Sequence, residues 1–159
     1  MNNSLPVFEV PENEPALDYE PDSTQRKELK QRIVELKKQS IEIPLIIGGK
    51  EVRTGVLGEC IAPHEHRHVL AEYHKAGREE AGLAIGAALD ARKVWSGFEW
   101  ADRIAIFKKA TDLLSTKWRS TMNAATMLGQ SKSAHQAEID SACELADFLR
   151  FNSYFAKRV

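Results

Sequence analysis

Apolar residues recur at helical spacing over most of the chain, beginning just after residue 22. The first helix is predicted from a cap at Asp22 or Ser23 to about Gln39. Its many lysines and arginines surround a narrow apolar stripe and are interrupted by glutamates. A solvated helix face therefore explains this basic segment better than a nucleic-acid contact does.

A stripe of mostly small residues predicts a second helix from Arg78 to Trp95. The stripe consists of Ala81, Ala84, Ile85, Ala88, Ala91 and Trp95. Gly82 and Gly86 each weaken such a helix by roughly 1 kcal/mol relative to alanine. We therefore expect this helix to be held by packing against another element.

Three more helices are predicted after the first two, beginning near Trp100. One begins near Trp100 and is expected to turn five residues inward: Ile106, Phe107, Ala110, Leu113 and Leu114. The next ends at Gly129, a residue type that suits the left-handed position after a helix. The last begins near Ser133 and continues through Phe148 towards Tyr154.

Short extended segments are predicted between the first and second helices. Residues 44–54 contain two short runs with β-branched residues on either side of the pair Gly48 and Gly49, which is typical of a tight hairpin. Further strands are expected around residues 60–61 and 69–73, with a turn at 63–68 between them. The predicted fold class is therefore α/β, mostly helical, with a few short strands and an extended N-terminal arm.

Residues 1–22 differ in composition from the rest of the chain. They contain four prolines, six acidic residues and no lysine or arginine. Each proline lacks an N–H donor and restricts the residue before it, so this segment cannot propagate a helix. We divide the chain into an extended acidic arm, 1–22, which packs on another surface or stays mobile, and a helical and hairpin region, 23–159.

Composition and charge exclude several classes of protein. The 159 residues include 22 Lys and Arg against 23 Asp and Glu, a balance that argues against binding nucleic acid by bulk charge. No apolar run is long enough to suggest a membrane span. The 2 cysteines favour a reducing compartment, and the arm resembles neither a transit peptide nor a secretory signal. We expect a cytoplasmic location, with the mitochondrial matrix as the alternative.

Three alternating histidines, His64, His66 and His68, are the first candidate site. In a strand they would share one face and could converge on a metal ion. A turn is the better interpretation directly after Pro63, and no other Cys, Asp or Glu stands at the spacing of a fourth ligand. We therefore expect no metal site.

Cofactor-binding and nucleophilic residues are not expected either. Residues 129–133 resemble the end of a phosphate-binding loop, but Ser131 occupies the place of the required glycine and no apolar strand precedes the segment. A complete G-x-G-x-x-G fingerprint is also missing. Cys60 and Cys143 have no neighbouring base or helix N-terminus that would lower the pKa of the thiol, so both are interpreted as structural.

Glu138 breaks the apolar pattern of the last predicted helix. In a regular helix it lies within about 40° of Ala142, Leu145 and Leu149. A carboxylate on a buried stripe is costly unless it is paired or hydrogen-bonded. A first-turn carboxylate at the rim, favoured by the helix dipole, is an equally open interpretation. Water is expected to solvate the acids on the opposite face, which are Asp140, Glu144 and Asp147.

Several segments resemble the aldehyde dehydrogenase family. PLIIGGKEVRTG from Pro44 and APHEHRHVLAEYH from Ala62 resemble its opening strands, and AALDARKVW from Ala87 and ADRIAIFKKATDLLS from Ala101 resemble its first core helices. The most specific segment is NAATMLGQSKSAHQAEIDSACELADFLRFNSYFA from Asn123. It resembles the glutamate-γ-semialdehyde dehydrogenases, also called 1-pyrroline-5-carboxylate dehydrogenases, which complete proline catabolism.

The resemblance implies that the chain is the N-terminal portion of a dehydrogenase that oxidises L-glutamate γ-semialdehyde to L-glutamate with NAD. Residues 23–159 would then be an incomplete part of the NAD-binding region. In the family the catalytic cysteine, the general base and the cofactor loop lie beyond the region that this chain matches. The resemblance thus implies no catalytic or cofactor-binding residue here, and neither Cys60 nor Cys143 matches the nucleophile.

Only one functional position is implied within the chain: Glu138 stands where this subfamily has a substrate-contacting glutamate. The resemblance also implies that the full-length protein forms a homo-oligomer. The alternative is a self-contained helical interaction module without catalytic activity.

Overall fold

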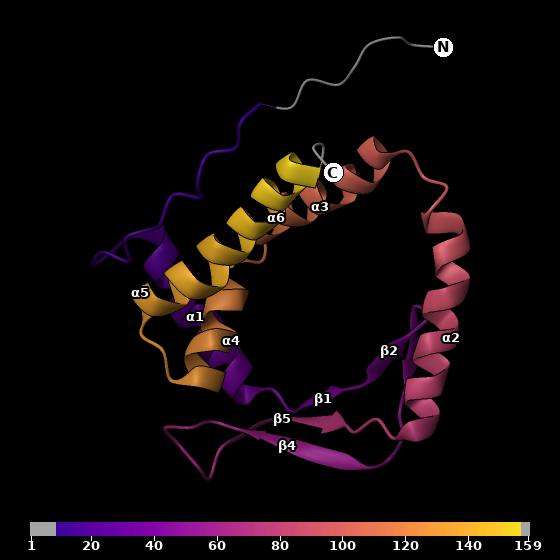
Figure 1. The fold of residues 1–159 in the computed structure, drawn as a ribbon. Helices are drawn as coiled ribbons and strands as arrows, with labels where there is room; N and C mark the ends of the chain where they lie inside the picture. Colours follow the sequence, from indigo (N-terminus) through magenta and orange to yellow (C-terminus); the bar gives the residue numbers. More distant parts are fainter. Residues whose placement is uncertain (1–8, 157–159) are drawn as a thin grey trace.

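Helices form most of the structure, and a small amount of sheet lies along one edge of it (Figure 1). The structure is a computed structural model, and it describes residues 9–156. The first eight residues of the predicted arm and the last three of the predicted region 23–159 lie outside the described residues. The helices are α1 (Thr24–Lys38), α2 (Arg78–Trp95), α3 (Trp100–Ser115), α4 (Arg119–Gln130), α5 (Ala134–Ala137), the π-helix η1 (Glu138–Cys143) and α6 (Glu144–Phe155).

The strands form a hairpin and a separate three-stranded sheet. The hairpin pairs β2 (Leu45–Ile47) with β3 (Lys50–Val52), and its turn residues Gly48 and Gly49 both have positive φ, as predicted. The sheet has the order β1-β5-β4. Its strands are β1 (Ile41–Ile43), β4 (Leu57–Ile61) and β5 (Val69–His74). The parallel pairing of β1 with β5 was not predicted, because the sequence of a three-residue strand does not indicate which distant strand it pairs with.

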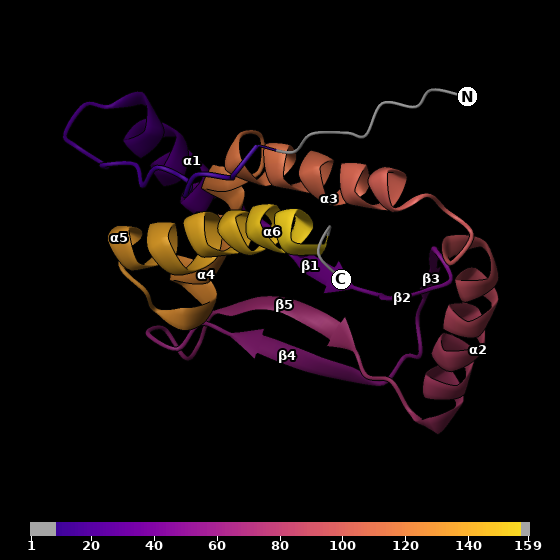
Figure 2. The same ribbon diagram turned by 45° about the horizontal axis from the view of Figure 1, so that its top comes forward.

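Alanines allow the helices of the main body to approach one another closely. Helix α1 packs on α4 and helix α3 packs on α6. The side chains between the helices include four alanines without exposed surface, together with Leu29 and Leu128: Ala124, Ala137, Ala142 and Ala146. In Figure 2, α3 and α6 run side by side. The helix predicted to begin at Asp22 or Ser23 is capped by Ser23, whose side chain accepts a hydrogen bond from the N–H of Arg26.

Helix α3 presents a different face to the core from the predicted one. Its buried residues are Ile104 and Thr111, which lie two turns apart. The predicted inward residues Ile106, Phe107 and Leu113 are exposed, Ile106 by 51%. The expectation was wrong because the apolar stripe of α3 is broader than the contact with α6, and side-chain type alone does not select the part that is covered.

The helix end predicted at Gly129 was also wrong. Helix α4 continues to Gln130, and Ser131 takes the left-handed conformation, with φ 56°. A left-handed backbone is unusual for a residue with a Cβ atom. The Ser131 hydroxyl is 2.8 Å from Nδ1 of His64 in the turn between β4 and β5, and this contact stabilises the cap.

The last predicted helix is interrupted by a wider turn. It begins after Ser133, as expected, with a reciprocal cap between Ser133 and Gln136. Residues 138–143 then form a π-helix, in which each N–H bonds to the carbonyl five residues earlier, before α6 begins. This wider turn changes the angular spacing, so Glu138, Ala142 and Cys143 are buried while the predicted stripe residue Leu145 is exposed.

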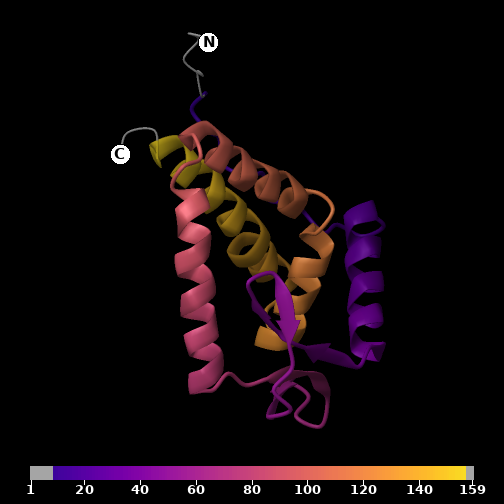
Figure 3. The ribbon, with the colours of Figure 1, turned by 90° about the vertical axis from the view of Figure 1, so that its right-hand side faces the viewer.

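Helix α2 stands apart from the other helices (Figures 1 and 3). Among the described residues, none of those in α2 is buried, and its main neighbour is strand β2. The large apolar side chains exposed along it include Leu83, Ile85, Leu89 and Val94. Of these, only Ile85 belongs to the predicted stripe, and at 100° per residue Leu83 and Val94 lie on the opposite side of the helix. The packing that was expected to hold α2 is not supplied by the described residues.

Candidate functional site: a buried carboxylate beneath the arm

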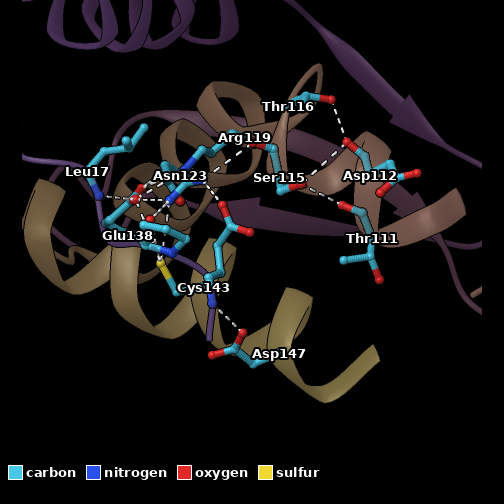
Figure 4. A network of polar contacts seen from close by, with 12 residues as sticks. Leu17, Thr111, Asp112, Ser115, Thr116, Arg119, Asn123, Glu138, Cys143 and Asp147 are labelled. Atoms are coloured by element: carbon cyan, nitrogen blue, oxygen red, sulfur yellow. Dashed lines mark hydrogen bonds and ion pairs between the residues drawn. The ribbon is translucent and has the colours of Figure 1, made fainter. Parts of the chain in front are cut away.

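The arm crosses the helices where α4 and η1 meet, and a polar cluster is buried beneath it (Figure 4). Glu138 at the start of η1 and Asn123 in α4 have no exposed surface. Arg119, the first residue of α4, lies beside them and is also buried. Of the two positions left open for Glu138, the structure thus shows the buried one.

Both carboxylate oxygens of Glu138 are hydrogen-bonded. Oε1 accepts from the N–H of Leu17 at 2.7 Å and from Nε of Arg119 at 3.1 Å, and the terminal guanidinium nitrogen of Arg119 also donates to it. Oε2 accepts from the hydroxyl of Tyr19 at 2.7 Å and from Nδ2 of Asn123 at 2.6 Å. The two oxygens therefore use nearly all of their acceptor capacity within this chain.

A chain of alternating charges extends from Glu138 to the edge of α6. Arg119 pairs with Glu138 on one side and with Glu14 of the arm on the other, and Glu14 also pairs with Arg150. Asp147 of α6 accepts from the backbone N–H of Glu14 at 2.6 Å. The expectation that water solvates Asp147 was therefore wrong, because the arm covers that carboxylate.

The protonation of the cluster follows from its hydrogen bonds. Burial by itself would raise the pKa of Glu138, but the hydrogen bonds from Arg119, Leu17 and Tyr19 outweigh it and hold the pKa below its usual range. Burial likewise opposes the charge on Arg119, yet its bonds to Glu138 and Glu14 raise its pKa. Glu138 is thus a carboxylate at neutral pH and is poorly suited to act as a general base.

The thiol of Cys143 lies at the edge of the same cluster. Its Sγ is 3.7 Å from Oε1 of Glu138 and 3.9 Å from the carbonyl oxygen of Pro15. Burial and the neighbouring negative charge of Glu138 raise the pKa of Cys143 to about 11. Such a thiol is almost entirely protonated at pH 7, which agrees with its interpretation as structural.

The partners of Glu138 were not predicted from the sequence. Tyr19 and Leu17 are more than a hundred residues away from it along the chain, so no local pattern connects them. One signal was available for Arg119. A basic residue in the first turn of a helix is disfavoured by the helix dipole, and such a residue needs an acidic partner.

The other sequence candidates lie outside this cluster. His64, His66 and His68 occupy the turn predicted for them, and no group of three potential metal ligands occurs within residues 9–156. Lys132, within the segment 129–133 that resembles the end of a phosphate-binding loop, pairs with Asp140 at 2.8 Å. Among the helices described, none is sufficiently long and apolar to cross a membrane.

The segment that resembles the end of a phosphate-binding loop connects α4 with α5, and the hydroxyl of its Ser131 lies 2.8 Å from Nδ1 of His64. Cys60 in β4 is partly exposed, whereas Cys143 is buried and has a raised pKa, which is not the setting of an activated nucleophile.

Comparison with known proteins identifies the class. The sequence profile of the Aldehyde dehydrogenase family matches residues 52–159, and the chain belongs to this family. It is 46% identical over 155 residues to a probable delta-1-pyrroline-5-carboxylate dehydrogenase of Schizosaccharomyces pombe, covering 96% of this chain and 28% of the relative. A mitochondrial delta-1-pyrroline-5-carboxylate dehydrogenase of Dictyostelium discoideum is 43% identical over 150 residues, 94% of this chain and 27% of the relative.

The fold agrees with this assignment. The crystal structure of the Delta-pyrroline-5-carboxylate dehydrogenase from Mycobacterium tuberculosis bound with NAD and cobalamin matches with a TM-score of 0.96 and 40% identity. The match covers 99% of this chain and 30% of that one. The predicted resemblance to the family is confirmed, and the chain spans less than a third of the length of these relatives.

Proposed function

We propose that this chain is the N-terminal portion of an NAD-dependent dehydrogenase that oxidises L-glutamate γ-semialdehyde to L-glutamate in proline catabolism. The observation that carries the proposal is the 46% identity to a probable delta-1-pyrroline-5-carboxylate dehydrogenase over 96% of this chain. Because such matches extend over nearly the whole chain, the alternative of a self-contained interaction module is not favoured.

The residues described here supply structure rather than chemistry to that enzyme. We assign the nucleophilic cysteine, the general base and the NAD site to the remainder of the polypeptide, since Cys143 is buried with a raised pKa and hydrogen bonds hold Glu138 as a carboxylate. The 159-residue chain alone is therefore expected to form no NADH from the semialdehyde and to show no measurable NAD binding. Steady NADH production above the blank would contradict this assignment.

A chimera gives the positive test. The chain would replace the matching 155-residue region of the Schizosaccharomyces pombe relative. NADH formation from the semialdehyde, followed by absorbance, is expected at a rate within about tenfold of the parent enzyme. A chimera that has the parent's circular dichroism and NAD affinity but no semialdehyde oxidation would contradict the proposal.

We also propose that Glu138 helps to recognise the amino-acid end of the substrate. Its carboxylate suits an α-ammonium group, and polar contacts discriminate between aldehydes of similar size better than apolar ones. Such a contact is worth about 1–3 kcal/mol, or ten- to hundred-fold in kcat/KM. Because both oxygens of Glu138 are occupied in the structure, a direct contact requires that Tyr19, Leu17 or another donor give up its bond.

Glu138→Gln in the chimera tests this role, with Glu144→Gln at the exposed first residue of α6 as the control. Recognition predicts a selective loss with the semialdehyde, partly as a higher KM, and little loss with a simple aliphatic aldehyde. An equal loss with both aldehydes in a folded chimera would instead assign Glu138 a purely structural role.

Location and assembly remain proposals of the same kind. Relatives from Dictyostelium discoideum, Emericella nidulans and Bos taurus are named mitochondrial, which supports the matrix alternative over the expected cytoplasmic location. The expected homo-oligomer can be tested on the chimera by sedimentation.

A further inference from the structure

The described part of the arm, residues 9–22, is attached to the helices by polar contacts to three separate elements. It reaches Asp147 on α6, Arg119 on α4 and Glu138 on η1. None of residues 9–22 is itself fully buried, whereas Glu138 beneath them has no exposed surface. The arm therefore covers the cluster without contributing much apolar burial of its own. The arm residues that make these contacts are Asn13, Glu14, Pro15, Leu17 and Tyr19.

Arg119 joins the arm to the buried cluster. Its Nη2 donates both to Glu138 and, at 2.6 Å, to the carbonyl oxygen of Pro15, and its Nη1 donates to Glu14. The arm cannot leave the helices while Glu14 and Pro15 hold this guanidinium. The pair of Arg119 with Glu138 can survive such a departure, because both residues belong to the helices.

Two grooves run along the sides of the arm. One, of about 570 Å³, lies between the arm and the η1–α6 helix and is lined by residues that include Ala16, Cys143 and Phe151. The other, of about 770 Å³, lies between the arm and α3 and is lined by residues that include Pro11 and Lys108. A segment held by polar contacts and flanked by grooves on both sides can open locally at a lower free energy than the packed helices can.

We infer that residues 9–22 form a strap that opens as a unit when Glu14 leaves Arg119 and Arg150, and that this opening, rather than unfolding of the helices, exposes Glu138 and Cys143. Strap opening removes the hydrogen bonds of Leu17 and Tyr19 from the carboxylate, which are the donors that a substrate contact would have to replace. The inference itself does not depend on the proposed function, because it concerns the isolated chain.

Thiol labelling of the folded 159-residue chain tests the strap. Cys143 is covered by the arm, and partly exposed Cys60 in β4 is an internal reference when peptides are resolved by mass spectrometry. Glu14→Gln removes the charge that holds Arg119 with little change of shape. It is expected to accelerate labelling of Cys143 at least about tenfold, because a hydrogen bond between charged groups is lost, and to leave Cys60 unchanged.

Low urea concentrations distinguish strap opening from global unfolding. Opening of a short polar segment exposes little surface, so Cys143 labelling is expected to depend only weakly on urea, whereas labelling through global unfolding depends on it steeply. Tyr19→Phe removes one arm contact without removing a charge and is expected to accelerate labelling about threefold or more. Lys93→Gln, which breaks an exposed pair with Asp90, is the control and should change nothing.

Two outcomes would overturn the inference. One is an unchanged Cys143 labelling rate in both Glu14→Gln and Tyr19→Phe. The other is a steep urea dependence that matches the free energy of global unfolding, because labelling would then report loss of the helices. Either result would leave the proposed dehydrogenase function untouched, since the chimera tests that separately.

Discussion

The cluster around Glu138 and helix α2 differ in which kind of side chain is buried and which is exposed. At Glu138, a group that belongs in water is buried, and residues of this chain complete its hydrogen bonds and balance its charge. In α2, large apolar side chains of the kind found in protein cores are exposed, and Leu89, for example, is 56% exposed. Residues 9–156 therefore supply the partners of the Glu138 cluster, but they do not cover the apolar side chains of α2.

The two regions also indicate which parts of the structure depend on a longer polypeptide. A contiguous exposed apolar face larger than a few hundred Å² usually marks an interface. The two relatives are more than three times as long as this chain, and the apolar side chains of α2 are exposed within the described residues. The arm and the Glu138 cluster need no further cover. The stability of the two regions can therefore be compared by substitutions in the isolated chain.

The largest effect is expected from Arg119→Met. Removing the guanidinium leaves Glu138 as a buried carboxylate without its counter-ion, which typically costs about 3–5 kcal/mol in the free energy of unfolding. Urea denaturation followed by circular dichroism measures the loss. The double variant Arg119→Met with Glu138→Leu should recover much of it, because neither charge is then stranded. A loss below about 1 kcal/mol in the single variant would mean that the cluster is not closed to water.

A pair of leucine truncations compares the two regions directly. Leu128 in α4 is 5% exposed, so Leu128→Ala should cost about 2–5 kcal/mol. Leu89→Ala in α2 removes the same atoms from an exposed position and should change stability by less than about 0.5 kcal/mol. Similar losses in the two variants would show that α2 is covered in solution, for example by a second copy of the chain.

Acid should weaken the Glu138 cluster and leave α2 unaffected. The pKa of Glu138 is lowered in the folded chain by Arg119, Leu17 and Tyr19, although burial opposes this. The stabilisation is therefore complete above the ordinary carboxyl pKa of 4.5 and is lost as the pH falls through the lower folded value. Unfolding free energies measured from pH 7 to pH 3 should fall more steeply for the parent chain than for Glu138→Gln. Identical slopes would contradict the assignment.

The smallest change in stability is expected from polar substitutions on α2. Leu83→Gln combined with Leu89→Gln should leave the unfolding midpoint nearly unchanged, because neither side chain is buried. The same substitutions should lower the fluorescence of a bound hydrophobic dye and reduce self-association. Gln substitution at the exposed Lys93 serves as the control for dye binding. Unchanged dye binding would place the exposed apolar face elsewhere.

The elements that could be predicted from the sequence are those with local causes. Ser23 and Ser133 cap their helices because a short side chain accepts a hydrogen bond from an N–H three residues later. Gly48 and Gly49 form the hairpin turn because both positions of the turn need positive φ, which glycine adopts without a steric cost. The family resemblance likewise rested on contiguous segments, and the comparisons confirm it.

The remaining features depend on contacts between distant segments. The periodicity singled out Glu138, but it could not show that Arg119, Tyr19 and Leu17 complete its hydrogen bonds. The pairing of β1 with β5 joins segments about thirty residues apart, and only the folded structure brings them together. The covered face of α3 was mispredicted for the same reason.

The π-helix sets which side of α6 meets the arm. Its wider turn holds one residue more than an α-helical turn does. If the same six residues formed an ordinary α-helix, everything after them would be rotated by about 100°. Asp147 and Arg150 would then turn away from Glu14, while Glu138 stayed in place. The contacts between α6 and the arm therefore depend on the wide turn that precedes α6.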